Sequence, residues 1–225
     1  MNLLNMKYMK SKLSKELTME DFYYFHSRNY LTTFYASPEM VIKAIETKDF
    51  DKAREIGNKL TLGDFEGLEF PIIFREKRDS GKRFRDVLDN RGGEMLISDR
   101  LKQLLIDNNI TGWKSYPICM FDKRGNEVHG YSGFSVIGRC GGTLEYITDK
   151  VCYEDGYRFF EGLSFDIAQW DGSDIFMVNG NRAIIITKLV YKLFKENKIN
   201  AIEMFALPQK PHGFISINMI GKNGN

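Results

Sequence analysis

The chain has 225 residues, of which 43% are apolar and 13% aromatic, enough for a sizeable core and unlike the composition of a disordered chain. Its 32 basic and 30 acidic residues give a formal charge of +2, so charge alone does not mark it as a nucleic-acid binder. It contains no run of about 20 apolar residues that would predict a membrane span, and residues 1–17 lack the apolar run of a signal peptide. We therefore expect a folded, cytoplasmic protein that has no membrane partner.

Residues 1–66 predict a helical N-terminal extension. Residues 1–36 are rich in aromatic side chains but show no sustained period. Ser37-Pro38-Glu39 is a typical helix start, with a hydroxyl at the N-cap and proline at the first helical position. Two apolar stripes follow at helical spacing: Met40, Val41, Ala44 and Ile45, then Phe50, Ala53, Ile56 and Leu60. Because the pattern breaks at residues 47–49, we expect a helical hairpin or one kinked helix.

Residues 67–225 predict a second domain, in which strands outnumber helices. Pro71 indicates that the first of these strands is an edge strand or begins at the proline, and the basic segment 77–85 indicates a loop. The expected strands cover residues 68–74, 94–97, 113–121, 128–137, 175–178, 183–186, 201–207 and 214–219, with two or three shorter ones between 143 and 160. Most run in local hairpins, which is typical of an α+β fold with a mostly antiparallel sheet.

One pattern occurs twice in this domain, 89 residues apart and without a gap. The two copies cover about residues 94–117 and 183–206. Each reads as a short apolar strand, a hydroxyl helix cap, an amphipathic helix and a second strand. Self-similarity of this kind indicates an internal duplication. Neither copy contains a residue set that is typical of catalysis.

Catalytic and metal-binding patterns are weak elsewhere too. Cys119 and His129 would face each other across a hairpin, but Cys119 lies in an apolar strand, where a buried, inert thiol is the common case. Asp171 and Asp174 flank a glycine turn without the regular alternation of a calcium loop, so we interpret them as turn residues. The three cysteines form neither a complete disulfide set nor a metal knuckle. We predict no enzymatic activity, no metal and no cofactor.

Charge is distributed unevenly along the chain. Between residues 145 and 174, eight acidic residues and two basic ones give a local charge of minus six, and aromatic residues are interleaved with them. Aromatic side chains supply contact energy at interfaces, so this segment is a candidate binding surface for a protein, although an ordinary solvated face has a similar composition. The candidate partner-binding residues are Glu145, Asp149, Glu154, Asp155, Tyr157, Glu161 and Asp166.

Two motifs carry a resemblance to a known family. Trp170-Asp171-Gly172-Ser173-Asp174-Ile175-Phe176, followed by Ile184-Ile185-Ile186-Thr187-Lys188 with its helix and second strand, resembles the C-terminal signature of bacterial immunity proteins from polymorphic-toxin systems. The first copy, from Leu96-Ile97-Ser98-Asp99 through Gly112-Trp113 and Tyr116-Pro117, is similar to the segment that precedes this signature. The resemblance covers roughly residues 84–207.

The resemblance implies a non-enzymatic cytoplasmic protein that binds and neutralises a co-produced toxin. If the toxin is a nuclease, its active site would be basic, and the acidic segment 145–174 would mimic its substrate. Two alternatives stay open. An enzyme acting on nucleotides or nucleic acid would bring the glycines at 92–93 and 138–142 and the basic segment 75–85 together with a carboxylate, whereas a scaffold or regulatory module would use the helices of residues 37–60. The sequence leaves the oligomeric state open.

Overall fold

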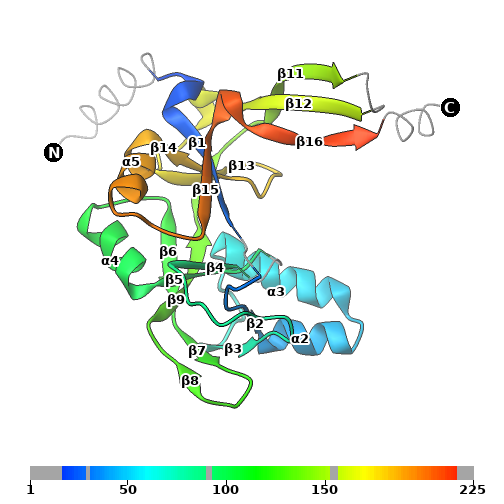
Figure 1. Ribbon diagram of the computed structural model, residues 1–225, viewed down its shortest axis with the longest axis vertical. Coiled ribbons are helices and arrows are strands. Elements are labelled where there is room, and N and C mark those ends of the chain that lie inside the picture. Colours follow the sequence, from blue (N-terminus) through cyan, green and yellow to red (C-terminus); the bar gives the residue numbers. More distant parts are fainter. Residues whose placement is uncertain (1–16, 29–30, 90–92, 153–156, 217–225) are drawn as a thin grey trace.

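The computed structural model describes residues 17–28, 31–89, 93–152 and 157–216, and for residues 148–152, 157–161 and 211–216 it describes the backbone only. These residues form four α-helices and four sheets, and most neighbouring strands are antiparallel (Figure 1). The predicted α+β class is therefore confirmed.

The largest sheet has five strands in the order β10-β13-β14-β1-β15. Its strands are β1 (Phe22–Ser27), β10 (Gly138–Cys140), β13 (Ile175–Val178), β14 (Ile184–Thr187) and β15 (Ile202–Ala206). β1 comes from the N-terminal part of the chain, where no strand pattern is visible, and it pairs antiparallel with both β14 and β15. An N-terminal strand thus lies inside a sheet that otherwise consists of C-terminal strands.

Two four-stranded sheets contain the middle of the chain. One has the order β4-β5-β9-β6 and the other β2-β3-β7-β8. Their strands are β2 (Ala36–Pro38), β3 (Ile72–Glu76), β4 (Val87–Asp89), β5 (Met95–Ser98), β6 (Trp113–Tyr116), β7 (Ile118–Phe121), β8 (Glu127–Val128) and β9 (Tyr131–Val136). The strand expected over 113–121 is divided at Pro117, which lacks an N–H for a ladder, so β6 and β7 belong to different sheets. The strand expected over 128–137 is likewise divided, at Gly130 (φ 87°).

The fourth sheet has three antiparallel strands, β11 (Glu145–Cys152), β12 (Tyr157–Ser164) and β16 (Pro211–Ser216), in the order β11-β12-β16. The shorter strands expected between 143 and 160 are therefore two strands of eight residues each. Figure 1 shows this sheet at one end of the molecule, beyond the five-stranded sheet.

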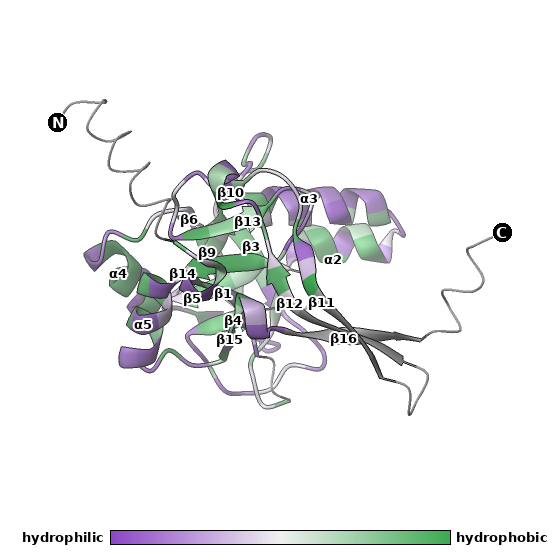
Figure 2. Ribbon diagram, turned by 90° about the horizontal axis from the view of Figure 1, so that it is seen from above, coloured by the Kyte–Doolittle hydropathy of each residue, from purple (hydrophilic) through white to green (hydrophobic). Residues whose placement is uncertain are grey.

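Two helices follow β2 and lie side by side (Figures 1 and 2). They are α2 (Glu39–Glu46) and α3 (Phe50–Leu62). The N-cap of α2 is Pro38 rather than Ser37, so this helix starts one residue later than expected. The Asp49 carboxylate accepts a hydrogen bond from the Lys52 N–H and caps α3, and Gly63 ends α3 in the left-handed conformation.

The other two helices, α4 (Asp99–Asp107) and α5 (Lys188–Glu196), have matching surroundings. Each follows a strand and a hydroxyl N-cap, Ser98 or Thr187. Each ends at an asparagine whose side-chain amide donates to a carbonyl one turn back, at 2.9 Å in both cases. The strands that flank α4 both pair with β9, and the strands that flank α5 both pair with β1. β1 in the five-stranded sheet and β9 in the sheet β4-β5-β9-β6 therefore hold equivalent places, each between the two strands that flank a helix.

Three hydrophobic clusters fill the interior. The first contains residues of α4 and α5, among them Leu101, Leu105, Val190 and Phe194, together with residues of the five-stranded sheet and of the sheet β4-β5-β9-β6. In the second cluster, side chains of α2 and α3 pack with those of β3 and β7. The third cluster includes Phe22 of β1 and Phe176 of β13. Residues on both sides of the predicted boundary at 66/67 contribute to each of the first two clusters.

The start of α2 generates a prediction about acid stability. Glu39 accepts hydrogen bonds from Lys43 (2.5 Å) and Arg75 (2.8 Å), and these bonds lower the pKa of its carboxyl group. A lowered folded-state pKa contributes stability above the ordinary pKa, which is lost as the pH falls through the folded value. We expect Glu39→Gln to lower the free energy of unfolding by up to about 1 kcal/mol at pH 7. The difference from wild type should shrink as the pH falls below the ordinary glutamate pKa of about 4.3.

Urea unfolding at several pH values measures this difference. Glu46→Gln, at the exposed end of the same helix, is the matched control and should stay close to wild type throughout. A difference for Glu39→Gln that is independent of pH would contradict the assignment.

Candidate partner-binding surface

The acidic segment forms the β11–β12 hairpin and the turn that leads to β13. In the strand register Glu145 lies opposite Ser164, Asp149 opposite Phe160, Glu161 opposite Thr148 and Tyr157 opposite Cys152. Glu154 and Asp155 lie outside the described residues, and so do the side chains of Asp149, Tyr157 and Glu161. The hairpin therefore places four of the seven candidate residues on two paired strands.

The start of β11 is the described part of this surface. Glu145 is exposed and accepts a hydrogen bond from the Thr143 hydroxyl at 3.0 Å. The next two residues, Tyr146 and Ile147, keep 48% and 45% of their surface exposed. Tyr146 also lines a groove of about 330 Å³ together with Tyr24, Leu144, Leu163, Asn181, Arg182 and Ala183. A carboxylate thus lies next to two large, accessible side chains, a combination suited to protein contacts.

Asp166, the seventh candidate, has a local structural role. Its carboxylate accepts hydrogen bonds from the Gln169 side chain (2.9 Å) and the Ala168 N–H (3.0 Å), and it caps the short 3-10 helix Ile167–Gln169. These bonds hold the pKa of Asp166 below its ordinary value. Its charge is therefore already engaged in ordering the chain.

The glycine turn before β13 is held by both of its carboxylates. Asp174 accepts from the N–H and the hydroxyl of Thr111, at 2.9 and 2.8 Å, and Asp171 accepts from the N–H groups of Arg139 (2.7 Å) and Ser173 (2.8 Å). Asp171 and Asp174 are therefore turn residues, as their context predicts. Among the residues that the structure describes, no group of three or more His, Cys, Asp or Glu side chains could hold a metal ion.

The glycines at 138–142 are used for close packing. A Cβ added at Gly138 would lie 2.2 Å from the Ile175 carbonyl oxygen, and one at Gly141 would lie 2.5 Å from the Gln169 side chain. The backbone contact excludes a side chain at Gly138, whereas at Gly141 the flexible end of Gln169 would have to move. In the described structure these two glycines let the backbone of residues 138–141 lie close to residues 169–175.

The two cysteines whose side chains are described show no sign of an activated thiol. Cys119 is half-buried on β7, where its register partner is Ile73 of β3. His129 is exposed and lies 3.6 Å from Glu127. Cys140 is buried, and burial raises the pKa of its thiol to about 11. A neutral thiol is a poor nucleophile.

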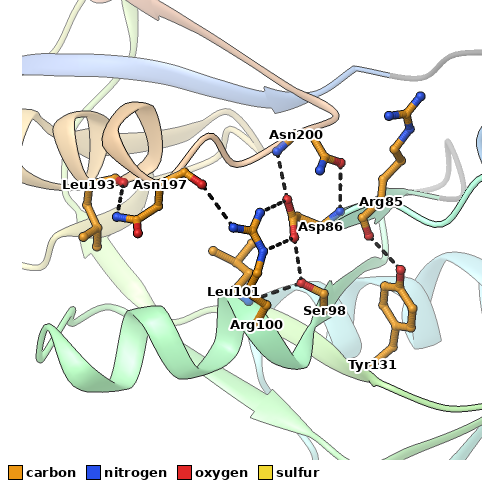
Figure 3. Close-up of polar contacts among 9 residues, drawn as sticks. All are labelled: Arg85, Asp86, Ser98, Arg100, Leu101, Tyr131, Leu193, Asn197 and Asn200. Carbon is orange, nitrogen blue, oxygen red and sulfur yellow. Dashed lines mark hydrogen bonds and ion pairs between the residues drawn. The ribbon is translucent and has the colours of Figure 1, made fainter.

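Sequence reasoning did not single out Asp86, whose carboxylate accepts several hydrogen bonds (Figure 3). This residue is only 5% exposed. One carboxylate oxygen accepts from the Ser98 hydroxyl (3.0 Å) and Arg100 Nε (3.1 Å). The other accepts from Arg100 Nη2 (2.5 Å) and the Asn200 N–H (3.0 Å). The Asp86 N–H in turn donates to the Asn200 side chain at 3.1 Å. The only sequence signal was an acidic residue directly before the apolar strand β4.

This network joins the two strand-helix-strand segments. Ser98 caps α4, Arg100 lies in its first turn, and Arg100 Nη1 also donates to the carbonyl of Asn197, the C-cap of α5, at 3.1 Å. Buried charges often mark functional sites. Here each Asp86 carboxylate oxygen accepts two hydrogen bonds inside the protein, so we assign the network a structural role.

Comparison with protein-family models finds no match for this chain, and a search of curated proteins finds no significant match either. Within the described ranges, no helix is both long enough and apolar enough to cross a membrane. The resemblance to immunity proteins therefore stands on its motif residues alone.

The Asp86 network generates a stability prediction. Asp86→Ala leaves the Asn200 N–H and the Ser98 hydroxyl without their acceptor, whereas Arg100, whose side chain is 55% exposed, can turn to solvent. A buried hydrogen-bonding group that is left without its partner costs about 1–3 kcal/mol. We expect a loss of that size in the free energy of unfolding, measured by chemical denaturation. Asp99→Asn, an exposed first-turn carboxylate on α4, is the control and should cost less than about 1 kcal/mol. Equal losses in the two variants would contradict the role of the network.

Proposed function

We propose that the protein is a non-enzymatic, cytoplasmic immunity protein that binds and neutralises a co-produced toxin through the acidic segment 145–174. The observation that supports this most directly is the exposed start of β11, where Glu145 lies beside Tyr146 and Ile147. Large accessible side chains supply contact energy, and the adjacent carboxylate adds selectivity for a basic partner.

The charge of the segment supports a nuclease as the toxin. Nuclease active sites bind a polyanion, and a segment with a local charge of minus six would be attracted to the same basic surface. Asp166, Asp171 and Asp174 already serve the fold. The negative charge available to the toxin would therefore come from the hairpin segment 145–164. Its acidic residues are Glu145, Asp149, Glu154, Asp155 and Glu161.

We propose further that residues 94–117 and 183–206 are copies of one unit. The hydroxyl residues that precede α4 and α5, the asparagine C-caps of both helices, and the equivalent places of β9 and β1 between their flanking strands support a duplication. In this proposal the C-terminal copy is completed by a strand from the N-terminal part of the chain. The duplicated units are the scaffold, and the hairpin inserted between them is the working surface.

Genetic neutralisation tests the proposed function. Each open reading frame next to this gene is expressed in a bacterial host, alone and together with this protein. We expect one of them to arrest growth alone and to be tolerated when this protein is present. If no neighbour is toxic, or if a toxic neighbour is not neutralised, the proposal fails.

The toxin found in this way allows a test of the surface. Glu154→Lys, Asp155→Lys and Glu161→Lys, made together, should slow association about tenfold or more at low ionic strength and change its salt dependence, because they reverse charges that steer the encounter. Surface plasmon resonance at two salt concentrations measures both effects. The matched control reverses three acids near the helices α2 and α3, Glu46, Asp51 and Glu66, all exposed. An unchanged association rate for the hairpin variant would rule out this surface.

A further inference from the structure

The five-stranded sheet ends at β15 (Figure 1). Among the described residues β15 pairs with β1 only, in the register Phe25↔Met204 and His26↔Glu203. The Arg28 N–H donates to the Ala201 carbonyl at 2.8 Å, which identifies Arg28 and Ala201 as a hydrogen-bonded pair. Because such pairs alternate in antiparallel ladders, Glu203 and Phe205 also bond to β1. Ile202 and Met204 therefore direct their N–H and C=O groups away from β1.

A groove follows this strand. Two adjoining hollows of about 480 and 330 Å³ share Met204 and Phe205 in their lining, so they lie end to end along β15. Tyr23 and Tyr191, whose rings stack at 3.9 Å, line the first, and Phe194, Ile199 and Ile202 line the second. The groove thus combines an unpaired strand edge with aromatic and aliphatic side chains set among polar ones. An added strand needs such an edge for its backbone and such side chains for its alternate residues.

The charges around the groove are predominantly basic. Its lining contains four cationic residues, Arg28, Lys188, Lys195 and Lys198, and two anionic ones, Glu20 and Glu203. Arg28 pairs with Glu203 and Lys188 with Asp21. Lys195 and Lys198 are exposed, and neither forms an ion pair within the described part of the chain. A bound segment with carboxylates near these two lysines would complement them.

We propose that β15 is a docking site for an extended, acidic segment of another protein, which adds to the sheet as a sixth strand and places alternate apolar side chains in the groove. This proposal is independent of the toxin-binding one, because it concerns a basic surface on a different sheet. Charge argues against two other occupants. The chain's own residues 1–16 contain four lysines and one acidic residue, and a second copy would bring its own Lys195 and Lys198 to the same edge.

A peptide selection tests the proposal with the full chain. A display library of random twelve-residue peptides is selected against the purified protein, and enriched peptides are measured by fluorescence anisotropy. We expect sequences that alternate apolar residues and contain Glu or Asp. Met204→Pro removes an outward N–H but no hydrogen bond to β1, and should weaken binding about tenfold or more, the effect of losing about 1.4 kcal/mol.

Two charge variants separate strand addition at this groove from other binding. Lys195→Glu with Lys198→Glu should weaken binding about tenfold at low salt, while Lys192→Glu with Lys52→Glu, exposed lysines that do not line the groove, should not. The proposal is overturned if no peptide is enriched, or if the enriched peptides bind both groove variants like wild type. It is also overturned if sedimentation shows a dimer that Met204→Pro dissociates, since the occupant would then be a second copy.

Discussion

The Asp86 network, which bonds α4 and the start of β4 to Asn197 and Asn200 after α5, is the set of interactions on which the relative position of α4 and α5 depends. A buried carboxylate is costly unless it is paired and fully hydrogen-bonded, and Asp86 meets that requirement with donors from both strand-helix-strand segments. Arg100 reaches in the same way to the carbonyl that ends α5. Apolar contacts between α4 and α5 tolerate small shifts, whereas these directional bonds do not. The Asp86 network therefore fixes the relative position of α4 and α5, which apolar contacts alone would leave variable.

Several carboxylates in the described structure stabilise the fold through hydrogen bonds. Asp86 joins the two segments, Asp174 ties the turn before β13 to Thr111, and Asp166 caps a short helix. A charged residue that is bonded in this way is a poor candidate for partner recognition, because its partners would have to be given up. Two surfaces that the described structure leaves accessible are the acidic, aromatic start of β11 and the basic groove along β15. The two surfaces have opposite character and would select different partners.

The parts of the fold that follow from sequence are the local ones. Ser98 caps α4 as its hydroxyl predicts, and β13 spans the residues expected from its turn and apolar run. What could not be predicted depends on contacts distant in sequence. β1 shows no alternating pattern because apolar clusters cover both of its faces, with Phe25 in the first cluster and Phe22 in the third. The break at Pro117 is a change of sheet. The acidic candidates were visible as composition, but the structural use of Asp166 and the role of Asp86 appear only in three dimensions.

The central position of β1 has a consequence for synthesis of the protein. Phe25 pairs with Ile184, which is 159 residues later in the chain. The ribosome makes the chain from its N-terminus, so β1 emerges long before the strands that border it. The sheet β4-β5-β9-β6 has all its strands within residues 87–136 and can form much earlier. During that interval the apolar side chains of β1 need either temporary shelter on the part already folded or a chaperone, because exposed strands of this kind promote aggregation.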